Sequence, residues 1–365
     1  MVVDNAAMDE IEDRARKGRG AVSNRAGRFE PAERVAIDDG WGSADADPPP
    51  LRTTVSVDAT RKIITTNESP DVPFDQSINP YKGCEHGCVY CFARPTHAYL
   101  GLSPGLDFES KLFAKPDAAK LLERELRHPR YRCKVIAMGT NTDPYQPVER
   151  TMGVTRAILE VLAAHDHPVT IVTKSALILR DLDILGPMAA KGLVAAAVSV
   201  TTLDRDLARR MEPRAATPER RLDAIRGLAD AGIPAGVMAA PMIPALNDME
   251  LERILEAAVA AGATTAGYVL LRLPLEIKDL WEEWLTTHVP GKAAHVMSLV
   301  RDTRGGKEYD SRWGKRMSGT GVYADLLAQR FAAASRKLGL TKRDWKLDTS
   351  QFHRPPAAGD QLSLL

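Results

Sequence analysis

The stretch Cys84-Glu85-His86-Gly87-Cys88-Val89-Tyr90-Cys91 places three cysteines at CxxxCxxC spacing in one short loop, directly after Asn79-Pro80-Tyr81-Lys82-Gly83. Such spacing lets three thiolates converge on one metal centre without the closure of a long loop. Thiolates are suitable ligands for iron–sulfur clusters and for zinc. Gly83 and Gly87 supply the backbone freedom that a loop needs to come close to such a centre. The stretch therefore predicts a thiolate metal site.

Two kinds of metal centre are compatible with this loop. A cubane cluster has four irons, so three local thiolates leave one iron open for a ligand from outside the protein. Zinc would need a fourth ligand, for which His86 is the alternative. Structural zinc usually takes two ligand pairs from separate knuckles, and no second CxxC and no HxxxH follow in this chain. The sequence favours an iron–sulfur cluster held by Cys84, Cys88 and Cys91, with zinc as the alternative.

Length and composition set the class of protein. A chain of 365 residues can bury one large core with appendages, and a net charge of +1 indicates no partner by itself. Four cysteines, three of them in one loop, indicate a reducing compartment and not a disulfide scaffold. We find no apolar run of membrane-spanning length and no signal peptide. We therefore expect a soluble cytoplasmic protein without a membrane partner.

Strand and helix patterns alternate through the middle of the chain. Runs of β-branched and apolar residues predict strands, and periodic stretches between them predict helices. The expected strands are residues 76–81, 134–138, 169–173, 194–200, 235–240 and 268–271, and the expected helices are residues 117–127, 153–164, 180–190, 216–231 and 248–261. This alternation predicts an α/β fold with a parallel barrel or open barrel of six strands. Residues 52–66 also alternate, as in a short hairpin.

The chain divides into four regions by composition. Residues 1–50 are charged and poor in apolar groups, which predicts a flexible tail, draped over the core or trailing from it, with nucleic-acid contact by its arginines as an alternative. Residues 51–275 hold the strand–helix repeat, 276–346 a helical extension and 347–365 a linker with a short peptide. Residues 301–346 hold twelve Lys and Arg against five Asp and Glu, an excess of seven. This surplus, interleaved with Trp and Tyr, predicts either a solvated helical face or a nucleic-acid surface.

Side chains at the C-terminal ends of the predicted strands are the candidates for a ligand pocket, because barrel active sites lie at that edge. The candidates are Thr140, Asn141 and Asp143 after the second strand, Lys174 after the third, Ser199 and Thr201 at the fourth, Met242 after the fifth and Arg272 after the sixth. A plain turn at Asp143-Pro144 and an exposed Lys174 are the structural alternatives. Arg272 is suited to a carboxylate or a substrate phosphate.

The cysteine loop, with the aromatic Tyr90 before its third cysteine, resembles that of the radical S-adenosylmethionine (SAM) superfamily. This resemblance implies a partial (β/α)6 TIM-type barrel, a [4Fe-4S] cluster, and SAM held by its amino and carboxylate groups on the open iron. It also implies that the reduced cluster cleaves SAM to a 5′-deoxyadenosyl radical, which abstracts hydrogen from the substrate. Flavodoxin or ferredoxin would be the electron donor. Tyr90 and the strand-end candidates would then contact SAM, with Met242 at the adenine.

Over roughly residues 75–275 the chain looks similar to the spore photoproduct lyase-like branch of that superfamily. The marks are the cysteine loop, Thr173-Lys174-Ser175 and Thr140-Asn141-Thr142-Asp143. True lyases repair a thymine dimer in DNA, return hydrogen through a cysteine at the second strand end, and carry Tyr after the third cluster cysteine. Here that strand end has no cysteine, Phe92 follows Cys91, and Cys133 lies at the start of the strand. The resemblance implies a subgroup that lacks the hydrogen-donor cysteine, which argues against spore photoproduct repair itself.

The C-terminal residues, Gln361-Leu362-Ser363-Leu364-Leu365, resemble the short peptide with which bacterial DNA polymerases and repair proteins dock on the sliding clamp. A flexible peptide that places apolar side chains in a preformed groove is a common mode of recognition. A frayed terminus is the alternative. Together with the basic segment, the peptide points to DNA and to the clamp as partners.

Three functional hypotheses follow. The leading one is a [4Fe-4S]- and SAM-dependent radical enzyme that acts on nucleic acid in a reaction related to DNA repair. The second keeps the radical chemistry but assigns it to a tRNA, a protein or a small molecule. The third is a non-catalytic, cluster-bearing protein that binds DNA or the clamp, and SAM cleavage distinguishes it from the other two. Substrate, product, hydrogen-atom donor and oligomeric state are not determined by the sequence.

Overall fold

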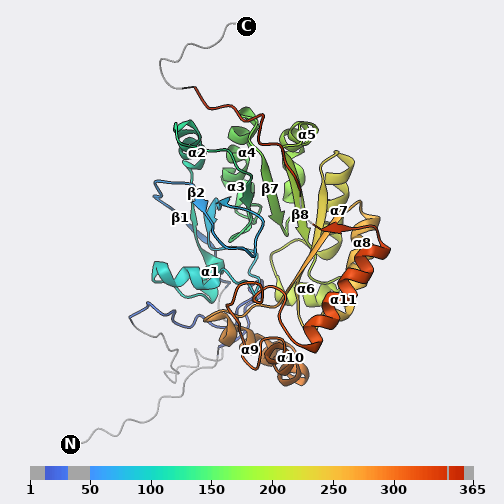
Figure 1. Cartoon of the computed structure of the whole chain (residues 1–365). Coiled ribbons are helices and arrows are strands. Elements are labelled where there is room, and N and C mark those ends of the chain that lie inside the picture. The colour runs from blue at the N-terminus through green and yellow to red at the C-terminus, as the bar shows by residue number, and fades with distance from the viewer. Residues whose placement is uncertain (1–12, 32–49, 343–344, 357–365) are drawn as a thin grey trace, which may run out of the picture.

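The computed structural model describes residues 13–31, 50–342 and 345–356, and it has an α/β architecture (Figure 1). An eight-stranded sheet forms its centre, in the order β11-β10-β9-β8-β7-β6-β3-β2. All neighbouring pairs in it are parallel except β2 and β3. The strands are β2 (Ile64–Thr66), β3 (Gln76–Ile78), β6 (Ile136–Met138), β7 (Val169–Thr173), β8 (Val194–Ser199), β9 (Ala235–Met242), β10 (Thr265–Leu270) and β11 (Thr341–Lys342).

Helices cover the outside of this curved sheet (Figure 1). They are α2 (Ala118–Arg127), α3 (Glu149–Met152), α4 (Val154–Ala164), α5 (Leu182–Ala190), α7 (Pro218–Asp230), α8 (Leu251–Ala260) and α11 (Val322–Lys337). All six residues of β8 are buried, as expected for a parallel strand that is covered on both faces. The six predicted strands are all present with shifts at their ends, and the predicted α/β class is confirmed.

The predicted hairpin over residues 52–66 is wrong. β1 (Thr54–Val57) pairs in parallel with β5 (Lys111–Ala114), which in turn pairs with β4 (Tyr81–Lys82) in a separate three-stranded sheet. β2, in contrast, joins the edge of the main sheet through β3. Alternation along the chain indicates a strand but not its partner, and all four residues of β1 are exposed, so burial did not specify its pairing.

The C-terminal extension corrects one part of the nucleic-acid hypothesis. α9 (Ile277–His288) and α10 (Pro290–Asp302) form a second apolar cluster, in which Trp281 and Trp284 stack with ring centroids 5.0 Å apart. Both rings are buried, so they belong to the core and cannot stack on bases. Residues 301–346, which hold the excess of Lys and Arg, are called the basic segment. In this segment Arg304 is also buried.

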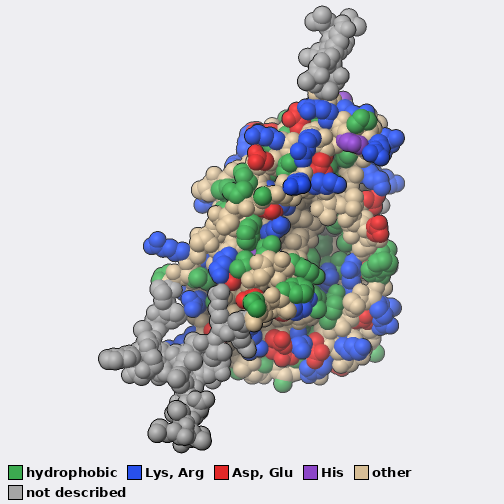
Figure 2. All heavy atoms as spheres, turned by 90° about the vertical axis from the view of Figure 1, so that its left-hand side faces the viewer, with side chains coloured by type: hydrophobic (Ala, Val, Ile, Leu, Met, Phe, Trp, Pro, Cys, Tyr) green, Lys and Arg blue, Asp and Glu red, His purple; other side chains and the backbone are tan. Residues whose placement is uncertain are grey.

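Several other arginines of this segment pair with carboxylates. The pairs are Arg312 with Asp310, Arg316 with Asp71 and Arg330 with Glu252. On the face shown in Figure 2, Lys and Arg side chains are interspersed with Asp and Glu, and the surface is hollowed near its centre. Because these arginines are paired with carboxylates, the basic segment presents less unpaired positive charge on the surface than its excess of Lys and Arg suggests.

The described part of the predicted tail includes buried residues. Arg19, Ala21, Val22 and Ser23 are each less than one-tenth exposed, so this stretch packs against the core and does not trail from it. The other predicted domain boundaries stay predictions. None of the helices in the described ranges is both long and apolar enough to cross a bilayer.

Candidate cluster and ligand site

The cysteine loop, residues 83–91, lies between β4 and the 3-10 helix η1 (Arg94–Leu100). Gly83 and Gly87 adopt positive φ angles of 75° and 67°. Residues other than glycine disfavour this backbone conformation because their Cβ atom clashes with the backbone. Cys84 and Cys88 are buried, Cys91 is half-buried, and none of the three forms a disulfide.

The electrostatics of the three thiols favour a positively charged group beside them. Burial raises the pKa of Cys84, Cys88 and Cys91, and the charges of the two neighbouring thiolates raise that of Cys84 further. A hydrogen bond from the Ala93 backbone lowers the pKa of Cys91, and nearby cations such as Lys174 lower the pKa of Cys88 and Cys91. Iron supplies the missing positive charge, because metal binding deprotonates a coordinating thiol. Three soft sulfur donors on one short loop therefore fit an iron–sulfur cluster.

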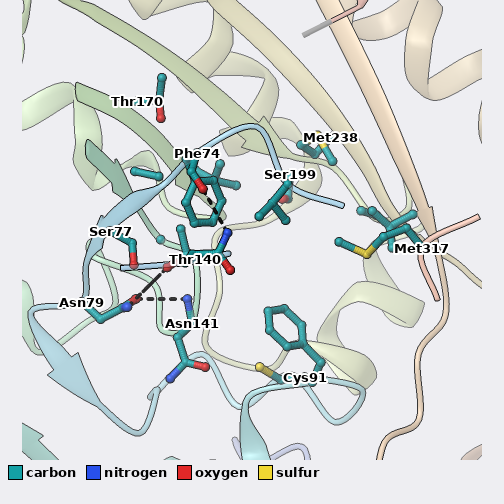
Figure 3. Close-up of a pocket in the computed structure, with 18 of the residues that line it drawn as sticks. Phe74, Ser77, Asn79, Cys91, Thr140, Asn141, Thr170, Ser199, Met238 and Met317 are labelled. Carbon is teal, nitrogen blue, oxygen red and sulfur yellow. Dashed lines mark hydrogen bonds between the residues drawn. The ribbon is translucent and has the colours of Figure 1, made fainter. Parts of the chain in front are cut away.

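A cavity of about 760 Å³ opens beside this loop, a size typical of ligand sites (Figure 3). Cys88 and Cys91 line one side, and Phe74, from the loop after β2, lines another. Predicted ligand residues that the cavity brings together are Tyr90, Thr140, Asn141, Lys174, Ser199 and Arg272. Its described lining does not include Cys84, Asp143, Thr201 or Met242.

Asn79, which the sequence analysis did not single out, fixes the turn after β6. Its side-chain oxygen accepts hydrogen bonds from the backbone N–H of Asn141 (3.0 Å) and Thr142 (3.3 Å), and its amide nitrogen donates to Thr140 Oγ1 at 3.3 Å (Figure 3). Gly139 begins this turn at φ +83°, where a Cβ would lie 1.9 Å from the Val172 carbonyl oxygen. Only glycine fits there. The loop before the cysteines thus positions Thr140 and Asn141 at the cavity.

Asp143 is occupied by protein partners and does not face the cavity. Its carboxylate lies 3.4 Å from His86 Nδ1 and accepts hydrogen bonds of 2.7 Å from Thr173 Oγ1 and from the Lys174 backbone N–H. Burial alone would raise the pKa of Asp143, but the His86 pair and these hydrogen bonds lower it below its ordinary value. Asp143 therefore joins the cysteine loop to the end of β7, and the prediction that it lines the ligand pocket is corrected. His86 does not line the cavity either.

Thr201 and Met242 also differ from prediction. Met242 is buried in the main core. Thr201 is buried, and its hydroxyl contacts the Glu212 carboxylate at 2.8 Å. Tyr90 donates a hydrogen bond to the same carboxylate from the cysteine loop. Lys174 Nζ lies 4.0 Å from it and 5.8 Å from the centre of the Tyr90 ring.

Glu212 was missed by sequence reasoning. It follows α6 (Arg205–Met211), whose charged residues suggest a solvated surface. It is in fact buried, and Arg221, which is also buried, donates a 2.5 Å hydrogen bond to its carboxylate. Burial raises the pKa of Glu212, and the charge of Arg221 acts in the opposite direction. Through Glu212 this ion pair contacts Tyr90 and Lys174, which both line the cavity.

Replacing Arg221 with methionine should destabilise the protein by about 3–5 kcal/mol, because Glu212 would be left buried without its cation. Equilibrium unfolding in urea measures the loss. The matched control is Arg220→Met, at a neighbouring arginine whose side chain is 70% exposed, where we expect a change of less than about 1 kcal/mol. Equal effects of the two substitutions would contradict this account of the pair.

Arg272 presents a cation without a carboxylate partner among the described residues. Its guanidinium lies 4.9 Å from the centre of the Phe92 ring, and Nη1 contacts Met317 Sδ at 3.4 Å. Its Nε is buried and has no hydrogen-bond partner in the part of the chain that the structure describes. Nearby, Asp71 accepts a 2.5 Å hydrogen bond from Arg316, which joins the loop after β2 to the loop before α11.

Cationic side chains are prominent in the lining of the cavity. Five of them line it, and its described lining contains no Asp or Glu; they are Lys82, Lys115, Lys174, Arg272 and Arg316. Lys82 and Arg316 pair with Asp58 and Asp71 from behind the lining. The remaining cations are suited to anionic groups of a ligand, such as a carboxylate or a phosphate.

Comparison with other proteins identifies relatives of the chain. Residues 78–258 match the family model described as the radical SAM superfamily. The chain is 38% identical over 232 residues to an uncharacterized protein of Mycobacterium tuberculosis (strain ATCC 25618 / H37Rv). The aligned region covers 63% of this chain and 68% of that protein. It is also 28% identical over 173 residues to an uncharacterized protein of Methanocaldococcus jannaschii, and this alignment covers 47% of this chain and 62% of that protein.

Solved structures show a similar fold. A spore photoproduct lyase variant superposes with a TM-score of 0.56 at 16% identity, over 80% of this chain and 82% of that chain. Spore photoproduct lyase complexed with dinucleoside spore photoproduct gives a TM-score of 0.53 at 17% identity, over 78% and 80%. At this identity the likeness concerns the fold alone, and it confirms the predicted partial barrel. With its cysteine loop at the family's position, this chain belongs to the radical SAM superfamily of enzymes, which use a [4Fe-4S] cluster and SAM.

Proposed function

We propose that Cys84, Cys88 and Cys91 hold the [4Fe-4S] cluster and that SAM binds in the adjoining cavity. Cluster and SAM together supply a 5′-deoxyadenosyl radical for hydrogen abstraction. The observation that supports these roles is the position of Cys88 and Cys91 in the wall of a cavity of ligand size. The protein itself contributes orientation and a pocket in which the reacting groups are held.

The proposed SAM contacts follow from charge and position. Lys174, whose charge lowers the pKa of Cys88 and Cys91, is placed to bind the SAM carboxylate. Thr140, Asn141 and Ser199 offer hydrogen-bonding side chains in the cavity wall. Tyr90, Asp143 and Thr201 hold this wall through their hydrogen bonds. Met242 is buried in the main core next to Pro241, which lines the cavity.

We propose nucleic acid as the substrate class, in a reaction related to DNA repair. Cations of the cavity lining such as Arg272 and Lys115 suit the phosphates of a nucleic acid, and the rings of Phe74, Phe92 and Trp345 among its lining suit base stacking. The solved structure with dinucleoside spore photoproduct is a neighbour of this chain in fold. A tRNA, a protein or a small anionic molecule is the alternative substrate.

The substrate class is tested by its effect on SAM turnover. Reconstituted, reduced protein is incubated with SAM and with untreated, ultraviolet-irradiated or alkylated DNA, with tRNA, or with a peptide mixture. We expect 5′-deoxyadenosine formation to rise about tenfold or more with one of the nucleic acids, because remote binding energy contributes to the chemical step. Stimulation by the peptides alone, or by none of the additions, would contradict the nucleic-acid proposal.

Replacing Arg272 with glutamine tests the proposed phosphate contact. Loss of a charged hydrogen bond should weaken binding of a fluorescein-labelled thymidylate octamer by about tenfold to a hundredfold and reduce the slope of log K against log salt by about 1. Fluorescence anisotropy measures both quantities. The control is Arg312→Gln, at an arginine that is 73% exposed and paired with Asp310. If SAM affinity falls while octamer affinity does not, Arg272 binds the SAM carboxylate instead.

Three predicted features have no structural test. The clamp-binding peptide, Gln361 to Leu365, lies outside the described residues, and clamp binding stays a prediction. We also propose flavodoxin or ferredoxin as electron donor and the cytoplasm as the location, since the thiols must stay reduced to hold the cluster.

A further inference from the structure

The N-terminal segment of residues 19–23 lies directly on the cysteine loop. A Cβ placed on Gly20 would lie 1.8 Å from the carbonyl oxygen of Gly87 and 3.3 Å from the backbone nitrogen of Val89. No side chain fits between the two backbones, so glycine is required at position 20. The neighbouring residues Ala21, Val22 and Ser23 are each at most 4% exposed.

A buried carboxylate holds this segment in place. Glu109, at the end of α1 (Leu106–Ser110), accepts hydrogen bonds from the backbone N–H of Gly20 (2.9 Å) and of Ala21 (2.8 Å). Its Oε1 also accepts a 2.5 Å hydrogen bond from Arg94 Nη2. The side chains of Glu109 and Arg94 are both 0% exposed, so the pair depends on these partners for its stability.

Arg94 connects this carboxylate to the cysteine loop. Its Nε donates to the Cys88 carbonyl at 2.9 Å and its Nη2 to the Gly87 carbonyl at 3.1 Å. Its charge also lowers the pKa of Cys91. A continuous set of contacts therefore runs from the backbone of Gly20 through Glu109 and Arg94 to the cysteines.

Arg19 forms a second connection to the loop. Its guanidinium donates to the Glu109 carbonyl at 2.8 Å, to the Leu51 carbonyl at 2.6 Å and to Thr53 Oγ1 at 3.1 Å. Thr53 in turn donates a 2.6 Å hydrogen bond to Glu85, inside the cysteine loop. Arg19 is thus a structural residue, which removes it from the arginines available for nucleic acid.

We propose that residues 19–23 form a cap of the cluster site, which excludes water and oxygen from the cysteine loop and lowers the reduction potential of the cluster. The inference rests on the proposed function, in which this loop holds the cluster. A cluster bound by three thiolates gains negative charge on reduction, so removing water from its surroundings disfavours the reduced form. A lower potential makes the reduced cluster a stronger electron donor. Gly20, Glu109 and Arg94 act as positioning residues through the loop backbone.

The test compares four anaerobically reconstituted proteins: wild type, a deletion of residues 1–25, Gly20→Val and the control Gly291→Val. A Cβ at Gly291, which lies in α10, meets no atom within 4 Å from the rest of the described chain beyond its own helix backbone. In the deletion and in Gly20→Val we expect cluster absorption to bleach about tenfold faster in air and the midpoint potential, followed by electron paramagnetic resonance, to shift to a more positive value. The control should behave as wild type.

Unchanged bleaching and an unchanged potential in both variants would overturn the proposal. Hydrogen exchange in wild type supplies a readout that needs no variant: the amides of Gly20 and Ala21 should exchange at least about a hundredfold slower than in an unstructured peptide, since they are buried and bonded. Exchange at the unstructured rate would equally overturn it. If the wild-type protein assembles no cluster, the proposed function fails. That outcome can be distinguished from failure of the cap proposal, because hydrogen exchange at Gly20 and Ala21 can be measured without iron.

Discussion

Replacing Cys84, Cys88 or Cys91 with alanine is expected to remove the cluster, leaving less than about one-tenth of the wild-type iron and sulfide per chain. In the proposed assignment each cysteine supplies the thiolate of one iron, and the structure provides no spare cysteine at the cavity among its described residues. Chemical assay of iron and acid-labile sulfide after anaerobic reconstitution measures the loss. Formation of 5′-deoxyadenosine should fall with the iron content.

Cys133→Ala is the matched control for these substitutions. Cys133 is half-buried, lies outside the described lining of the cavity, and burial raises the pKa of its thiol to about 11. A single thiol that lies away from the cysteine loop should not hold the cluster. This variant should keep wild-type iron content. Equal loss in Cys133→Ala, or full retention in Cys84→Ala, would contradict the assignment of ligands.

The second large effect is expected at Arg94. Replacing it with methionine should reduce the free energy of unfolding by about 3–5 kcal/mol, because the Glu109 carboxylate would stay buried without its cation. The carbonyls of Gly87, Cys88, Pro104 and Gly105 would also lose their donor. Urea unfolding of the iron-free protein measures this loss separately from any effect of the cluster.

Two further variants make the Arg94 result specific. Arg127→Met removes an arginine whose side chain is 39% exposed and pairs with Glu123 along α2, and such surface pairs contribute less than about 1 kcal/mol. The double variant Arg94→Met with Glu109→Gln should recover part of the loss, because it removes the unpaired charge. A loss at Arg94 no larger than that at Arg127 would contradict the account of a buried ion pair beneath the cysteine loop.

The sequence predicted the features that depend on local pattern. A buried parallel strand such as β8 is a nearly continuous run of apolar residues, which can be recognised without knowledge of its partners. The cysteine loop was recognised by spacing, since three ligands in one short segment need no distant contact. Strand ends such as Thr140 and Lys174 were found because topology brings the carboxyl ends of parallel strands to one edge.

Features that depend on distant contacts were missed. The charges of Glu212 and Arg221 resemble those of solvated helices, and only the tertiary structure shows that both are buried. The run Lys17-Gly18-Arg19-Gly20-Ala21 has the composition of a loose tail, yet Gly20 packs on Gly87 from 67 residues away. Glycine in a charged segment was the available signal for close backbone packing, and its partner could not be deduced from the sequence.

Asp143 shows a related limit. Its place at a strand end correctly indicated the edge of the sheet where the site lies. Its carboxylate, however, is bonded to His86, Thr173 and Lys174 and does not face the cavity. Topology predicts which residues reach the edge, but the orientation of each side chain depends on the hydrogen-bond partners that surround it.

The most direct test of the central claim is the reductive cleavage of SAM. The anaerobically reconstituted protein is reduced with dithionite, given SAM, and assayed by chromatography for 5′-deoxyadenosine and methionine. The account predicts that both products form, that they require the reduced cluster, and that they disappear in the Cys84→Ala, Cys88→Ala and Cys91→Ala variants but not in Cys133→Ala. A protein that binds zinc in this loop, or one that assembles the cluster but leaves SAM intact, would contradict it.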